Sequence, residues 1–439
     1  MCAAIYLAES RKRKQAAREA DAWTPTANDE RTWLIAYASQ TGFAEQLARQ
    51  TARVLHTGGV TARVSTLSGV DEETLRSAER VLFIASTYGE GDPPDNASLF
   101  FDRLMQRPAE LGGLHYGLLM LGDRSYANFC GFGRALATWL TASRAQALFD
   151  PVTVDNEGSE SLQAWQHHIH RIAGTNDVPD WQAPAYQAWR LAVRRLLNPH
   201  SAGGPVYHIE LEAPDDHAGT WEAGDLAQIL APQDRQRARE YSVASIPADK
   251  RIHLLVRQEQ HEDGTLGVAS GWLTHGAPIG TSIDLRLRTH GNFRIGTNAH
   301  RPLILIGNGT GLAGLRSHLK ARAAVFATHP SRNWLIFGER NAASDFYYRD
   351  EIEVWQSQGV LTNLDMVFSR DQNERRYVQD RLRERADAVH EWIAQGAAIY
   401  VCGSLEGMAG GVETGLIDIL GEDAVAELVA QGRYKRDVY

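Results

Sequence analysis

A run of apolar residues ends in a small polar loop in the segment Trp33-Leu34-Ile35-Ala36-Tyr37-Ala38-Ser39-Gln40-Thr41-Gly42. The run predicts a buried strand, and apolar residues at helical spacing follow the loop. Further apolar runs occur at 81–86, 118–121 and 152–154, with helical patterns between them. Strands that alternate with helices predict a parallel, doubly wound α/β sheet.

The polar loop predicts a phosphate site. In an open α/β sheet, ligands bind past the carboxyl ends of the strands, and hydroxyls with N–H groups at a helix N-terminus form an anion cradle. The loop lacks a Lys and a second Gly, which favours a phosphate monoester over a nucleoside triphosphate; the alternative is an ordinary N-cap. The predicted contacts are Ser39, Gln40, Thr41, Gly42, Phe43 and Ala44.

Two aromatic side chains follow later strands of this predicted sheet. Tyr88 comes after 81–86 and Tyr126 after 118–121. They are expected at one sheet edge, where two rings can sandwich a flavin. The predicted contacts are Thr87, Tyr88, Gly89, Glu90, Gly91, Leu121, Gly122, Asp123, Tyr126, Asn128, Phe129 and Asp155.

A Pro- and Gly-rich segment from about Thr175 to Gly204 surrounds a helical pattern at Tyr186 to Leu197, which predicts a linker with one helix. Short strands without intervening helices follow and predict a small antiparallel barrel. The alternation of strand and helix then returns near Leu303. Expected strands are 206–211, 226–230, 241–245, 252–257 and 283–287 in the barrel, and 303–306, 335–337, 365–368 and 399–402 after it.

The predicted barrel carries a candidate second flavin site. Arg239 and Tyr241 share one face of a strand, where an Arg can pair with a pyrophosphate and a Tyr can pack on a flavin ring. A helix beginning near Gly267 would point its N-terminus at the same pyrophosphate; the alternative is a solvated strand with a capped helix. The predicted contacts are Arg239, Tyr241, Ser242, Gly267, Val268, Ala269 and Ser270.

A glycine cluster at 307–311 follows a strand and opens a helix, a pattern typical of nicotinamide dinucleotide binding. Hydroxyl and cationic groups after a later strand suit the 2′-phosphate of NADPH, whereas an NADH site places a carboxylate on the ribose. Asp371 would repel phosphate if it faced the site. The predicted contacts are Gly307, Gly309, Thr310, Gly311, Ser369, Arg370, Arg375 and Tyr377.

These motifs, with the ending Gly432–Tyr439, resemble those of the NADPH-dependent diflavin reductases and are most similar to the flavoprotein subunit of sulfite reductase. The resemblance implies a flavodoxin-like FMN domain, a ferredoxin-reductase-like FAD barrel and an NADPH-binding α/β domain. It also implies a hydride-transfer cluster of Ser242, Cys402 and Asp437. Tyr439 would stack on the FAD ring until the nicotinamide displaces it.

The chain departs from this family in two places. Asn308 stands where the family usually has proline, and Arg239 follows Gly224 too closely for the helical connecting domain of full-size members. The resemblance therefore does not predict the docking geometry between FMN and FAD. The expected division is a leader or truncated membrane anchor at 1–30, the FMN domain at 31–174, a linker at 175–203, the FAD barrel at 204–298 and the NADPH domain at 299–439.

Composition narrows the function classes. The net charge of −9 argues against a nucleic-acid partner. Cys2, Cys130 and Cys402 are far apart, so neither a disulfide framework nor a cysteine-ligated metal is expected, and no metal is predicted. The apolar Met1 to Ala8 followed by basic Arg11 to Lys14 fits either a basic leader or the cytoplasmic flank of a truncated transmembrane helix. The expected location is the cytoplasm or the cytoplasmic face of the inner membrane.

The expected activity is that of an NADPH–haemoprotein reductase or an NADPH sulfite reductase flavoprotein. Hydride would pass from NADPH to FAD, and single electrons would pass through FMN to a haem- or sirohaem-type protein. One alternative is a membrane-associated ferric or quinone reductase that uses the N-terminal segment. Another is a redox-sensing flavoprotein without catalytic activity.

Overall fold

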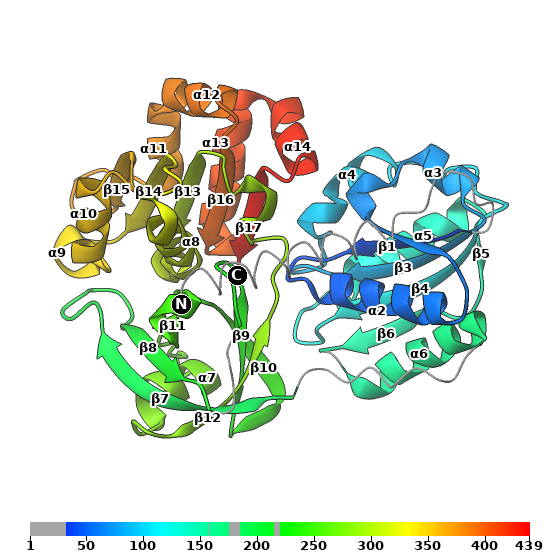
Figure 1. Cartoon of the computed structure of the whole chain (residues 1–439), viewed down its shortest axis with the longest axis horizontal. Helices are drawn as coiled ribbons and strands as arrows, with labels where there is room; N and C mark the ends of the chain where they lie inside the picture. Colours follow the sequence, from blue (N-terminus) through cyan, green and yellow to red (C-terminus); the bar gives the residue numbers. More distant parts are fainter. Residues whose placement is uncertain (1–31, 157, 175–184, 215–219) are drawn as a thin grey trace. The chain divides into compact units, whose positions relative to one another are not determined.

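The computed structural model describes residues 32–156, 158–174, 185–214 and 220–439 (Figure 1). The chain divides into two compact units, residues 1–182 and 183–439. The leader or anchor predicted at 1–30 lies outside the described residues. Within the described ranges, no helix combines the length and apolar character needed to cross a membrane.

The first unit is built on a six-stranded sheet with the order β2-β1-β3-β4-β5, and β6 pairs with β4. All of its strand pairs are parallel, as predicted. The second strand escaped prediction because only its first residue, Ala62, is buried. The strands are β1 (Trp33–Ala38), β2 (Ala62–Thr66), β3 (Arg80–Ser86), β4 (His115–Gly122), β5 (Gln146–Ala147) and β6 (Val152–Asp155).

Two layers of helices cover this sheet (Figure 1). One core cluster contains Leu47 and Trp165 from α2 and α6. The other contains Phe100 and Trp139 from α4 and α5. The doubly wound arrangement is thereby confirmed. The helices are α2 (Phe43–Thr57), α3 (Glu72–Ser77), α4 (Ser98–Arg103), α5 (Gly131–Ala142) and α6 (Ser159–Ala173).

The second unit begins with an antiparallel six-stranded sheet of order β10-β9-β12-β7-β8-β11. This curled sheet confirms the predicted barrel class. Beside it lie the short helix α7 (Val268–Gly271), which begins where predicted, and η4 (Trp272–Gly276). The strands are β7 (Gln187–Leu196), β8 (Val206–Glu212), β9 (Leu226–Ala231), β10 (Asp234–Ser242), β11 (Arg251–Arg257) and β12 (Ser282–Arg288).

The helix predicted at Tyr186 to Leu197 is wrong, because this segment forms β7 and pairs with β8 and β12. A register shift between Leu191 and Val193 breaks the alternation of buried and exposed residues. Without a clean period of two, the sequence pattern looked helical. Residues from Gln187 onward therefore belong to the barrel sheet. The strand predicted at 241–245 instead ends at Ser242.

The rest of the second unit is a five-stranded parallel sheet of order β15-β14-β13-β16-β17. Its edge strand β17 was not predicted because Lys435 and Arg436 interrupt any apolar run. The strands are β13 (Leu303–Asn308), β14 (Asn333–Glu339), β15 (Asn363–Phe368), β16 (Ala398–Gly403) and β17 (Tyr434–Val438). The helices include α8 (Leu312–Val325), α9 (Ala342–Asp345), α10 (Arg349–Ser357), α11 (Val378–Glu384), α12 (Ala386–Ala394), α13 (Gly410–Leu420) and α14 (Glu422–Ala430).

Candidate active site

The loop after β1 is held in shape by its own side chains. The Ser39 hydroxyl accepts a hydrogen bond from the Gly42 N–H at 2.9 Å. The buried Gln40 amide donates to the Asp95 carboxylate at 3.1 Å and accepts from the Asp95 N–H at 3.0 Å. Gly42 has a φ of 91°, a conformation that glycine adopts without strain. The loop leads directly into α2. The backbone N–H groups in the first turn of this helix have no acceptors within the helix, so they are available to bind an anion.

The loops after β3 and β4 are tied together at the same sheet edge. The Asn128 amide donates to the Glu90 carbonyl at 2.7 Å, and the Ala127 N–H donates to the Glu90 carboxylate at 3.2 Å. Tyr88 is half-buried, while Tyr126 is 46% exposed. An aromatic pair carried on two linked loops suits the two faces of a planar ring.

Of the other predicted contacts in the first unit, some have polar groups that hold the loops or could meet a cofactor, and others serve close packing. The Thr87 hydroxyl is buried and has no hydrogen-bond partner within the described residues, which is expected when the partner is a bound cofactor. Asp155 accepts a hydrogen bond from the Arg124 N–H at 3.0 Å and so anchors the loop after β4. A Cβ atom at Gly122 would lie 2.7 Å from the Cys130 nitrogen, so this glycine serves close packing.

In the second unit, the end of β10 carries the predicted flavin contacts. Arg239 is half-exposed and lies 3.5 Å from Asp234. Tyr241 is packed in the protein, and burial raises its pKa. At the start of α7, the Ser270 hydroxyl accepts from the Glu259 N–H at 3.2 Å. A Cβ atom at Gly267 would lie 2.7 Å from that hydroxyl, which explains the glycine.

A cavity of about 690 Å³ lies at the carboxyl ends of β13, β14 and β15. The predicted dinucleotide contacts fall at its wall: the loop residues Gly309 and Thr310, the later residues Ser369, Arg370 and Tyr377, and the terminal Tyr439. Gly307 and Gly311 are not among the lining residues. A Cβ atom at Gly311 would lie 2.0 Å from the Cys402 carbonyl, so this glycine lets the loop pack on β16.

The charge of the cavity wall fits a phosphorylated ligand. Arg376 lines it, whereas the predicted Arg375 is not among the lining residues, and Arg340 also contributes. Arg340 follows the end of β14, a position that the sequence could have flagged. The acidic Glu339 is offset by Arg257, whose guanidinium donates to it at 3.1 Å. The wall therefore offers arginine donors suited to phosphate oxygens.

Asp371 does not oppose phosphate binding. Its carboxylate accepts hydrogen bonds from the Asn341 amide and from the Ala342 N–H, each at 2.8 Å. It therefore caps the start of α9, and it is not among the residues that line the cavity. The repulsion considered from sequence does not arise.

The predicted hydride-transfer residues meet in space. The Ser242 hydroxyl donates to Asp437 Oδ2 at 2.6 Å, and the Cys402 thiol donates to the same oxygen at 3.6 Å. Cys402 and Asp437 are register partners on β16 and β17. All three side chains are buried. Burial, and next the nearby Asp437 charge, raise the pKa of the Cys402 thiol well above its ordinary value, so the thiol stays protonated at neutral pH.

The terminal residue connects this cluster to the cavity. The Tyr439 hydroxyl donates to the Thr310 hydroxyl at 3.0 Å, and its ring is largely exposed. Its backbone is fixed by hydrogen bonds to Gly403 and from Leu405. Tyr439 thus lines the same cavity, two residues beyond Asp437.

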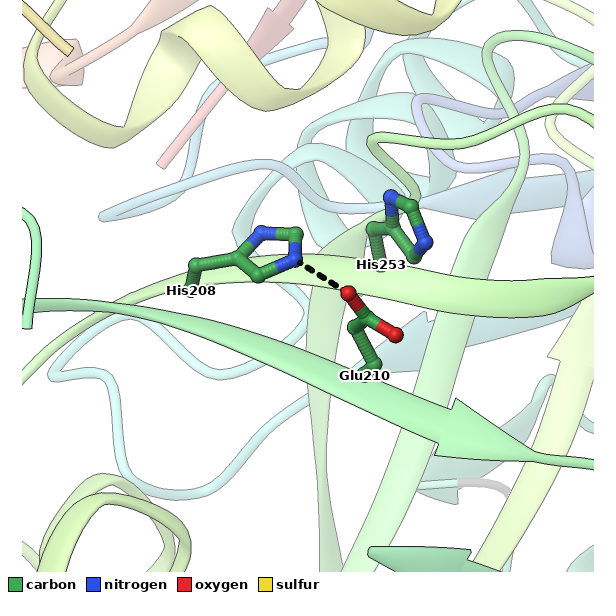
Figure 2. Close-up of side chains that lie close together, drawn as sticks. All are labelled: His208, Glu210 and His253. Atoms are coloured by element: carbon green, nitrogen blue, oxygen red, sulfur yellow. Dashed lines mark hydrogen bonds and ion pairs between the residues drawn. The ribbon is translucent and has the colours of Figure 1, made fainter. Parts of the chain in front are cut away.

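Figure 2 shows a second cluster of polar side chains on β8 and β11, formed by His208, Glu210 and His253. The Glu210 carboxylate contacts His208 at 3.1 Å and accepts from Arg251 at 2.8 Å. Arg316 lies 3.3 Å from His253 Nδ1. Because guanidinium can only donate, this contact makes Nδ1 the acceptor and leaves Nε2 protonated. Two nearby guanidinium groups also repel a cation, so these contacts favour an ion-pair network over a metal site.

Comparison with known proteins agrees with this architecture. Residues 35–167 match the Flavodoxin family, and residues 305–414 match the Oxidoreductase NAD-binding domain family. The chain is similar to the "Sulfite reductase [NADPH] flavoprotein alpha-component" of Vibrio cholerae serotype O1, with 27% identity over 92% of this chain and 87% of the relative. The protein of the same name from Bacillus subtilis is 26% identical over 97% of this chain and 91% of the relative.

The first of these alignments is 537 residues long, longer than this chain of 439 residues, so the relative contains segments that this chain lacks. That difference agrees with the connecting domain expected to be missing. The matches confirm the resemblance to the diflavin reductases, the oxidoreductase class and the predicted cofactors FMN, FAD and NADPH.

Proposed function

We propose that this chain passes hydride from NADPH to FAD and then single electrons through FMN to a haem- or sirohaem-type protein. A hydride donor releases two electrons together, whereas a haem accepts one, and a pair of flavins reconciles the two. The observation that carries the proposal is that the cavity lies next to the buried cluster of Ser242, Cys402 and Asp437. Tyr439 lines the cavity, and Asp437 two residues earlier accepts from Ser242 and Cys402.

The residues of this junction have separate tasks in the proposal. FAD, when bound, supplies the hydride acceptor. Tyr439 occupies the position that the nicotinamide would take. Its hydrogen bond to Thr310 must break before the nicotinamide enters. Ser242 holds a proton on its hydroxyl oxygen, directed toward Asp437. Cys402 stays neutral and adds no competing charge next to the reacting atoms.

We assign FMN to residues 31–174, FAD to the barrel up to residue 298 and NADPH to residues 299–439. We further propose that the FMN-binding unit moves between FAD and the acceptor. A short crosslink between the two units should then stop acceptor reduction while NADPH still reduces FAD. Unchanged acceptor turnover in the crosslinked protein would contradict this movement.

The relatives named as NADPH sulfite reductase flavoproteins support a haemoprotein partner and a cytoplasmic location for this chain. The alternative, a ferric or quinone reductase at the inner membrane, rests on the apolar and basic pattern of residues 1–14. Additional apolar codons in frame upstream of Met1 would favour that alternative. The buried Ser242–Asp437–Cys402 cluster argues against a purely sensing role, because a sensor has no need of hydride transfer.

The experiment that tests the proposal is an anaerobic acceptor screen with purified protein. Cytochrome c, ferric chelates and a soluble quinone would each be offered with NADPH or NADH. One-electron acceptors should be reduced with NADPH in preference to NADH, and removal of FMN should abolish their reduction. Acceptor reduction that persists without FMN would contradict the proposed electron path.

A further inference from the structure

Asp437 has a third side-chain neighbour, His290, which follows β12. The His290 Nδ1 atom lies 4.0 Å from Asp437 Oδ1. Ser242 and Cys402 contact the other carboxylate oxygen, Oδ2. The two oxygens of Asp437 therefore face different partners, and His290 approaches the oxygen that the other two leave.

The environment of Asp437 makes this neighbour consequential. The side chains of His290 and Asp437 are 0% and 7% exposed. Among the described residues, His290 is the only basic side chain within 4.0 Å of Asp437. Burying a carboxylate charge without a nearby positive or hydrogen-bonding group costs free energy. A basic side chain beside the carboxylate restricts the orientation of its two oxygens.

The fold holds His290 in place independently of Asp437. Its backbone N–H donates to Asp225 Oδ1 at 3.0 Å. Asp225 is clamped in turn by the Arg294 guanidinium at 2.6 and 2.5 Å. The His290 ring stacks on Phe293 with centroids 5.8 Å apart and an interplanar angle of 24°. These contacts hold the imidazole beside Asp437.

We propose that His290 is a positioning residue for hydride transfer, because it fixes the Asp437 carboxylate so that Oδ2 faces Ser242 and Cys402. His290 acts through Asp437 and need not touch the flavin or the nucleotide. The predicted effect on hydride transfer rests on the proposed function. The contact between His290 and Asp437 is independent of that function and can be tested in protein without cofactors.

His318 on α8 provides a matched control. It is also buried, and its ring packs on Phe293 and on Tyr400 with centroids 5.0 and 4.9 Å away. It has no ion pair with Asp437 among the described residues. Burial lowers the pKa of His318 to about 3, so it stays neutral. Loss of His318 removes a buried imidazole beside Phe293 without removing the partner of Asp437.

The first test is a double-mutant cycle on the flavin-free chain, with unfolding by urea as the readout. The variants are H290F, D437N and their combination, beside H318F, D437N and their combination. The effects of H290F and D437N should be non-additive, because they remove the same contact, whereas those of H318F and D437N should add. H290N, whose shorter side chain withdraws from Asp437, repeats the cycle if H290F does not fold. Additive effects in the His290 cycle would overturn the inference.

The second test is rapid-mixing reduction of FAD by NADPH in the flavin-loaded full chain. H290F should slow hydride transfer about ten- to a hundredfold, since a small misplacement of a reacting group has effects of that size. The NADPH dissociation constant should not change. H290Q, which keeps a polar side chain beside Asp437, should recover much of the rate, and H318F should resemble the unmodified chain. Equal rates for H290F and H318F would overturn the inference. Absence of FAD reduction in the unmodified chain would instead defeat the proposed function and leave the unfolding cycle valid.

Discussion

Asn308 Oδ1 accepts a hydrogen bond from the backbone N–H of Ser404 at 3.1 Å. This contact ties the glycine loop after β13 to the loop after β16, and residues of both loops line the cavity proposed to bind NADPH. The diflavin reductases that the chain resembles usually have proline at position 308. The Asn308 side chain thus restrains the loop through a hydrogen bond that a proline side chain could not make.

The Asn308 contact predicts a loss of both stability and nucleotide affinity in N308A. Loss of one hydrogen bond of this kind should lower the free energy of unfolding by about 1 kcal/mol. The Michaelis constant for NADPH should rise because the loop is less restrained. Urea unfolding and steady-state kinetics measure the two effects. S404A keeps the backbone donor, so an equal loss of stability in S404A would contradict this account.

Removal of the Tyr126 ring should release FMN selectively. Y126A is expected to lose FMN while retaining FAD, because Tyr126 lies on the loops of the first unit. Flavin extraction followed by chromatography measures both cofactors. Y377A removes a similarly exposed tyrosine at the cavity of the second unit and should keep FMN. Loss of FAD from Y126A would contradict the assignment of the two sites.

Removal of the Arg370 side chain should weaken the preference for NADPH over NADH. A charge-assisted contact to phosphate is worth about 1.5–3 kcal/mol, so R370A should lower the ratio of kcat/KM values at least about tenfold. Most of the change should appear with NADPH. R383A is the matched control, because it removes an arginine that pairs with Asp418 and does not line the cavity. An unchanged cofactor ratio in R370A would contradict the proposed phosphate site.

His253 should make the protein less stable as the pH falls. Burial is the main reason that the pKa of His253 drops from 6.5 to about 4, and the charges of His208 and Arg316 add to it. The unfolded chain therefore binds a proton between these pH values while the folded chain does not. The contribution of neutral His253 to the free energy of unfolding is fully present above pH 6.5 and is lost as the pH falls toward 4.

H253Q should therefore flatten the dependence of unfolding free energy on pH between 6.5 and 4. The change should be on the order of 2 kcal/mol, measured by urea unfolding at several pH values. H329Q, which replaces an exposed histidine, should leave the slope as it is. A slope in H253Q equal to that of the unmodified chain would show that His253 is not the titrating group.

The parts of the fold that follow regular patterns were predictable. The buried strands β1, β3 and β13 are continuous apolar runs, and their order identified two parallel sheets. The strand β7 was mistaken for a helix because its bulge near Leu191 destroys the alternation. The edge strand β17 was missed because an edge position tolerates charged residues such as Lys435.

Local loop geometry was predictable where motifs fix it, as in the glycine loop at 307–311 and the loop at 39–42. It was not predictable where contacts depend on tertiary folding. The orientation of Asp371 toward Ala342, and the selection of Arg376 over its neighbour at the cavity wall, depend on the turn after β15. The approach of His290 to Asp437 joins residues far apart in the chain, and no local pattern signals it.

The most direct measurement of the central claim is the flavin content of purified protein combined with anaerobic titration by NADPH. The account predicts one FAD and one FMN per chain, with FAD reduced first and FMN reduced through it. Y126A should then retain FAD reduction without FMN reduction. A single flavin per chain, or two flavins that NADPH does not reduce, would contradict the account.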